Sequence, residues 1–194
     1  MKIIVEANEE QWLELEPIKH INWVRVESDE NFDKNFDAAA YFNLVNRVIN
    51  KYYDLPIVII SDDSKSLHNK NVFIINSWSG FLSRNIWEIK GEKNEKVEDV
   101  ISKLGKKLSW TNGEFVSSRI ISMIINEAYF AFEENVSTKE EINTAMKLGT
   151  GYPYGPFEWA SKIGLKNVFN LLEKLAKSDT RYTPSETLRK EANF

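Results

Sequence analysis

The apolar residues of this chain change their spacing near its middle. Before about residue 94, short runs of β-branched and aromatic residues alternate with polar stretches, which is the rhythm of strands joined by helices. From Glu95 onward, apolar residues recur every three or four positions, the period of an amphipathic helix. The chain is therefore predicted to fold as an α/β portion, 1–94, followed by an all-helical portion, 95–194.

The first portion contains five candidate strands. Several are near-continuous apolar runs, which is typical of strands covered on both faces, so a small, mostly parallel sheet is predicted. Helices are predicted at 9–15 and 43–51, and 27–37 is an acidic, polar loop. The strands are expected at residues 2–5, 22–26, 39–44, 57–60 and 72–76.

Glycine, proline and capping residues divide the second portion into helices. An apolar stripe from Val97 to Leu108 predicts the first helix, and 115–133 is apolar enough for a central, mostly buried one. A capping box at 137–141 opens the next, which should stop near Gly149 and Gly151. Pro156 and Gly164 suit the start and end of a short helix, and a last one is expected at 165–177.

Composition excludes several classes of protein. The net charge is −4, without a cluster of Lys and Arg interleaved with aromatic residues, so nucleic acid is not an expected partner. Cysteine is absent, which removes disulfides, thiolate zinc sites and thiol nucleophiles. No apolar run reaches the roughly 18 residues that span a bilayer. We therefore expect a cytoplasmic protein.

The segment 145–165, AMKLGTGYPYGPFEWASKIGL, combines a glycine-terminated helix with a Tyr-Pro, Gly-Pro-Phe-Glu turn. It resembles the hallmark of the C-terminal domain of the 3-hydroxyacyl-CoA dehydrogenases. Flanking sequence supports the resemblance over roughly 113–190. The resemblance implies a helical domain that forms a homodimer and supplies part of an acyl-CoA groove.

The N-terminal portion lacks the glycine-rich loop with which this family binds NAD. The strand MKIIVEA continues directly into Asn8, Glu9 and Glu10, and no G-x-G-x-x-G occurs in the chain. Carboxylates at a helix start complement the helix dipole but repel a diphosphate. We therefore expect a reduced, Rossmann-like portion and no bound cofactor.

Four positions correspond to the catalytic residues of the family. NVFIINSWSGFLSRNIWEIKG resembles the strand that carries the catalytic His and, twelve residues later, the Glu that orients it; these positions hold Asn76 and Glu88. Ser64 best matches the substrate-contacting serine, and Ser118 replaces the family Asn. An amide does not titrate, so Asn76 cannot act as the general base.

These residues also have ordinary structural interpretations. Glu88 would suit an edge strand, and Ser64 a turn. Asp62 and Asp63 would be solvated loop acids, and His20 and His68 surface residues, so no metal is expected.

Three functions remain open at this point. The favoured one is a 3-hydroxyacyl-CoA dehydrogenase-like pseudoenzyme, a homodimer that binds an acyl-CoA or a protein partner without redox chemistry. The second is an NAD-dependent dehydrogenase with residual activity, or with activity that depends on a complex. The third is a purely structural dimerisation module.

Overall fold

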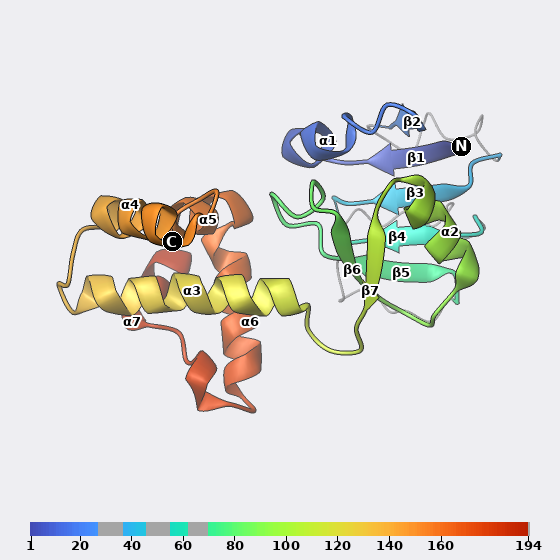
Figure 1. Cartoon of the computed structure of the whole chain (residues 1–194). Helices are drawn as coiled ribbons and strands as arrows, with labels where there is room; N and C mark the ends of the chain where they lie inside the picture. Colours follow the sequence, from blue (N-terminus) through green and yellow to red (C-terminus); the bar gives the residue numbers. More distant parts are fainter. Residues whose placement is uncertain (27–36, 46–54, 62–69, 194) are drawn as a thin grey trace. The chain divides into compact units, whose positions relative to one another are not determined.

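The computed structural model describes residues 1–26, 37–45, 55–61 and 70–193 (Figure 1). The chain divides into two compact units, Met1–Phe115 and Val116–Phe194. Among the described residues, no helix is long and apolar enough to cross a membrane.

The first unit is built on a mostly parallel sheet, as predicted. Its seven strands follow the order β2-β1-β3-β4-β5-β6-β7. Only β5 and β6 are antiparallel; the other neighbouring pairs run parallel. The elements are β1 (Lys2–Glu6), α1 (Glu9–Leu15), β2 (Asn22–Arg25), β3 (Ala40–Asn43), β4 (Val58–Ile60), β5 (Val72–Ile75), β6 (Ile86–Lys90), α2 (Glu95–Lys103) and β7 (Lys107–Trp110).

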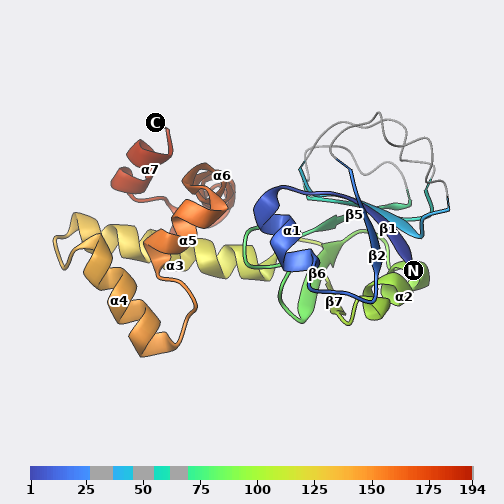
Figure 2. The same cartoon turned by 90° about the horizontal axis from the view of Figure 1, so that it is seen from above.

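Each face of the sheet has its own core. Figure 2 shows α1 and α2 on the same face, where Leu15 and Val97 pack with Trp87 in one apolar cluster. On the other face, Tyr41 and Ile74 belong to a second cluster. Burial on both faces explains why β1, β3, β4 and β5 are almost wholly apolar.

The sheet unit continues beyond the boundary expected after residue 94. Helix α2 ends at its C-cap Leu104, and Gly105 follows with a φ of +74°, a left-handed conformation that stops a helix. Leu108, which the periodic pattern assigned to this helix, lies in β7, and β7 pairs with β6. These hydrogen bonds join β7 to the sheet, α2 packs Val97 and Ile101 into the same core, and the compact unit ends at Phe115.

The second unit is all helical, as predicted. Thr138 caps α4 and forms a capping box with Glu141, while Gly151 ends this helix with a φ of +69°. Pro156 occupies the first turn of α5, and Gly164 ends it. The helices are α3 (Val116–Glu133), α4 (Lys139–Thr150), α5 (Pro156–Ile163), α6 (Leu165–Ala176), a 3-10 turn (Thr180–Tyr182) and α7 (Glu186–Ala192).

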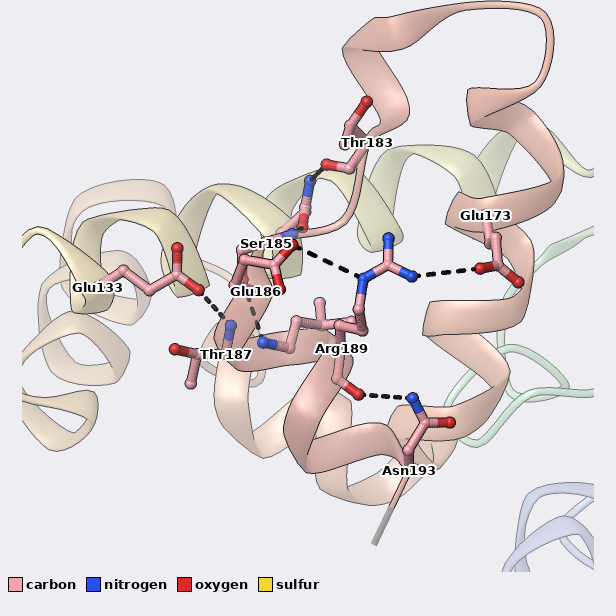
Figure 3. Close-up of polar contacts among 10 residues, drawn as sticks. Glu133, Glu173, Thr183, Ser185, Glu186, Thr187, Arg189 and Asn193 are labelled. Atoms are coloured by element: carbon pink, nitrogen blue, oxygen red, sulfur yellow. Dashed lines mark hydrogen bonds and ion pairs between the residues drawn. The ribbon is translucent and has the colours of Figure 1, made fainter.

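The tail contains α7, a helix that the sequence reading did not identify. Ser185 caps it by accepting a hydrogen bond from the Leu188 N–H. A carboxylate oxygen of Glu133, on α3, accepts from the backbone N–H of Thr187 (Figure 3). The tail is therefore held against α3 through backbone groups, which side-chain periodicity does not reveal.

Candidate functional site

The carboxyl ends of β1 and β3 form the topological switch point of the sheet. Strand β2 lies on one side of β1 and β3 on the other, and ligands of open α/β sheets bind outside the strand ends at such points. Glu6 and Asn43 are register partners there, and both are buried. The carboxylate of Glu6 accepts a hydrogen bond of 2.9 Å from the Tyr41 hydroxyl.

The first turn of α1 satisfies its own backbone donors. The side chain of Asn8 accepts from the Gln11 N–H at 2.9 Å, and the side chain of Gln11 accepts from the Asn8 N–H at 3.1 Å. Glu9 makes an ion pair of 2.5 Å with Arg25 on β2. Side-chain acceptors therefore already occupy two of the N–H groups that this helix terminus offers to an anion.

Gln11 also ties α1 to two other strand ends. Its Nε2 donates to the carbonyl of Leu44 at 3.0 Å and to that of Ser77 at 3.3 Å. Sequence reasoning did not identify Gln11, although Asn followed three residues later by Gln is a capping-box pattern. Its contacts with Leu44 and Ser77, 33 and 66 positions away, cannot be predicted from the neighbouring sequence.

Asn76, which directly follows β5, lies opposite Glu88 in the middle of β6, twelve residues further along the sequence. The Asn76 N–H donates to the Glu88 carbonyl at 3.4 Å, one step beyond the register pair of Ile75 and Ile89. Residues opposite each other in an antiparallel pair point to the same face. Asn76 is buried, and its Oδ1 accepts from the Trp78 N–H at 3.3 Å.

The other two expected site residues lie elsewhere in the chain. Ser118 is buried on α3, in the second unit. Ser64, like Asp62, Asp63 and His68, lies outside the described residues. The structure thus brings Asn76 and Glu88 together within one unit.

His20 is the remaining titratable candidate among the described residues, and it contacts a backbone carbonyl. His20 is exposed, and its Nε2 lies 2.6 Å from the Lys103 carbonyl at the end of α2, where it can donate a hydrogen bond. Within the described ranges, no group of three or more His, Asp or Glu residues could hold a metal ion.

A cationic clasp joins four helices of the second unit. The Lys139 ammonium lies 5.0 to 5.2 Å from the ring centroids of Tyr129, Phe132 and Phe157, and 2.7 and 2.8 Å from the carboxylate oxygens of Glu191. The Tyr129 hydroxyl donates to the same carboxylate at 2.7 Å. Burial, reinforced by this hydrogen bond, raises the pKa of Tyr129.

Acid should weaken this clasp. Burial works against ionisation of Glu191, but hydrogen bonds from Lys139 and Tyr129 outweigh it and lower the pKa of Glu191 below its ordinary value of 4.5. A lowered pKa contributes stability above the unfolded-state value, and this contribution is lost as pH falls through the folded-state value. On acidification, the free energy of unfolding of the wild type should thus fall more than that of Glu191→Gln. Urea unfolding at several pH values measures both. If the stability of the two proteins depended on pH in the same way, Glu191 would not be the group that stabilises the clasp.

The sequence likeness to known proteins lies mainly in the second unit. Residues 115–193 match the sequence model described as "3-hydroxyacyl-CoA dehydrogenase, C-terminal domain". The chain is 42% identical over 76 residues to the 3-hydroxyadipyl-CoA dehydrogenase of Escherichia coli K12, covering 38% of this chain and 16% of that protein. It is 35% identical over 100 residues to the 3-hydroxybutyryl-CoA dehydrogenase of Bradyrhizobium diazoefficiens, covering 50% and 34%.

The fold likeness extends over nearly the whole chain. The crystal structure of (S)-3-hydroxybutyryl-CoA dehydrogenase from Ralstonia eutropha matches with a TM-score of 0.73 and 17% identity, covering 97% of this chain and 92% of that one. Residues 115–193 are therefore similar to the C-terminal domain of the 3-hydroxyacyl-CoA dehydrogenases. The matched regions nonetheless span only about a third or less of the two curated relatives named above.

Proposed function

We propose that this chain is a 3-hydroxyacyl-CoA dehydrogenase-like pseudoenzyme that binds an acyl-CoA ester or a protein partner without transferring hydride. Its family relatives act on hydroxyacyl-CoA substrates according to their names. The observation that carries the proposal is Asn76, buried at the strand end where the resemblance expects the catalytic His. An amide neither accepts nor releases a proton near neutral pH, so this residue cannot supply general-base catalysis.

The residues at the start of α1 do not fit the diphosphate of NAD. The N–H groups of Asn8 and Gln11 are engaged by each other's side chains. The carboxylate of Glu6 is buried at the end of β1, and Glu9 and Glu10 add negative charge to the first turn. A diphosphate bound at the Asn8 and Gln11 N–H groups would have to break the capping box and approach these carboxylates, and like charges repel. This supports the absence of NAD binding in the family manner.

A second candidate is a dehydrogenase that is active only in a complex, in which another chain brings the nucleotide domain. The position of Glu88 opposite Asn76 favours this candidate, because one member of the family's catalytic pair is retained. The purely structural alternative requires only the helical unit, and acyl-CoA binding would contradict it.

A turnover assay separates these candidates. We expect no formation of NADH when the purified protein is incubated with 3-hydroxybutyryl-CoA and NAD. Asn76→His should also be inactive, since restoring the imidazole leaves the capping box at α1 in place. NAD-dependent turnover by either protein alone would contradict the pseudoenzyme proposal. Activity that appears only after adding another chain would favour the complex-dependent dehydrogenase.

The second unit is proposed to form a homodimer through its helices. Helix α4 has no buried residue, and Leu148 on it is 83% exposed. Val136, just before the helix, is 69% exposed. Covering such apolar side chains is favourable. Sedimentation equilibrium should give twice the mass of one chain, and Leu148→Glu should shift the protein towards the monomer. A monomeric wild type would contradict this proposal.

A further inference from the structure

The turn after β5 is held by a carboxylate from α1. One oxygen of Glu14 accepts from the Gly80 N–H at 2.6 Å, and the other accepts from the Ser83 N–H at 2.8 Å. Gly80 has a φ of +87°, a left-handed conformation that glycine adopts readily. Backbone N–H groups that converge in a turn, here those of Gly80 and Ser83, can hold an anion. The arrangement is therefore that of an anion-binding turn with a carboxylate bound in it.

The rest of the turn is fixed independently of Glu14. Lys106 donates to the carbonyls of Ser83 and Arg84 at 3.1 and 2.9 Å, and the Trp87 indole donates to the Leu82 carbonyl at 2.9 Å. The Phe81 N–H donates to the Trp78 carbonyl at 3.0 Å. With its carbonyls held in this way, the turn would keep its N–H groups gathered if the carboxylate were removed.

A positive charge accompanies the bound carboxylate. Burial lowers the pKa of Lys106, and the negative charge of Glu14 opposes that effect. The two side chains are thus close enough to interact, and together they hold the donors and the acceptors of one turn. A cation beside converging N–H groups is the environment that an oxyanion prefers.

The same turn leads away from Asn76. The Trp78 N–H donates to Asn76 Oδ1, and Gln11, three residues before Glu14 on α1, holds the Ser77 carbonyl. Residues three apart lie on one face of a helix. Glu14 and Gln11 therefore fix the backbone that follows Asn76 from a single helix face.

We propose that residues 78–84 form an anion-binding turn whose built-in ligand is the Glu14 carboxylate, and that a free carboxylate or phosphate occupies the turn when Glu14 is removed. Glu14 is then a positioning residue for the segment that follows Asn76. The inference does not depend on acyl-CoA binding, since it concerns contacts within the first unit only.

Hydrogen exchange on the full chain tests this inference. In Glu14→Ala, the amides of Gly80 and Ser83 should exchange about tenfold faster or more, because each loses a hydrogen bond to a charged group. Adding acetate should restore protection of both amides, whereas sodium chloride at the same ionic strength should not. The matched control is Glu10→Ala, an exposed acid of the same helix, which should leave both amides unchanged.

Three outcomes would overturn the inference: unchanged exchange in Glu14→Ala, no protection by either acetate or phosphate, or equal protection by chloride. Protection by phosphate instead of acetate would still support an anion site and would identify a tetrahedral oxyanion as its better ligand. If Glu14→Ala does not fold, Glu14→Gln keeps one carbonyl acceptor and should lose protection at one of the two amides. Protection at both would then count against the carboxylate as the ligand.

Discussion

Asn126→Ala should lower the free energy of unfolding of the second unit by about 3 kcal/mol. Asn126 is fully buried on α3. Its Oδ1 accepts from the Ser185 N–H and its Nδ2 donates to the Thr183 carbonyl, both at 2.9 Å. Alanine leaves these two backbone groups without a partner, and each buried orphan costs about 1 to 3 kcal/mol. Urea denaturation measures the loss.

Glu127→Ala is the matched control, since Glu127 is the exposed neighbour on the same helix. Its effect should stay within about 0.5 kcal/mol. In Asn126→Ala, faster hydrogen exchange should be concentrated in the tail from Thr183 to Ala192, the segment that Asn126 anchors. A destabilisation no larger than that of Glu127→Ala would contradict the anchoring role.

Gly155→Ala should destabilise the second unit by about 3 kcal/mol. A Cβ at this position would lie 2.5 Å from the Cβ and Cγ atoms of Asn143 on α4, and overpacking of this kind costs about 1 to 3 kcal/mol. Asn143 would have to move, although its Oδ1 accepts from the Phe157 N–H at 2.9 Å. Loss of that hydrogen bond adds about 1 kcal/mol. Thermal or urea unfolding measures the total loss of stability from overpacking and from the lost hydrogen bond.

Gly149→Ala, in the same segment 145–165, should not destabilise the second unit. A Cβ on Gly149 meets nothing within 4 Å, and the residue lies in the last turn of α4. Alanine favours a helix over glycine by up to about 1 kcal/mol, so this variant should be neutral or slightly stabilised. If the two variants were equally stable, close packing at Gly155 would be excluded as the reason for glycine there.

Much of the fold follows from local patterns. The five expected strands correspond to β1 to β5, because strands buried on both faces leave apolar runs that are visible in the sequence. The helix starts at Thr138 and Pro156 depend on capping rules that act within one turn. Most of the helix expected at 43–51 lies outside the described residues, and Asn43 ends β3.

What the sequence did not predict depends on distant partners. Leu108 continues the helical period of α2, but pairing with β6 places it in β7. The tail helix α7 is defined by its contacts with α3, including Asn126 and Glu133. In the candidate site, the antiparallel pairing places Asn76 opposite Glu88. Gln11 and Glu14 were missed because each acts on backbone groups far along the chain.

We propose that this chain binds an acyl-CoA ester but not NAD. Calorimetric titration of the purified protein with NADH and, separately, with acetoacetyl-CoA tests it most directly. We expect saturable heat from acetoacetyl-CoA and none from NADH. Saturable heat from NADH would contradict it, because the dinucleotide would then bind despite the capped start of α1.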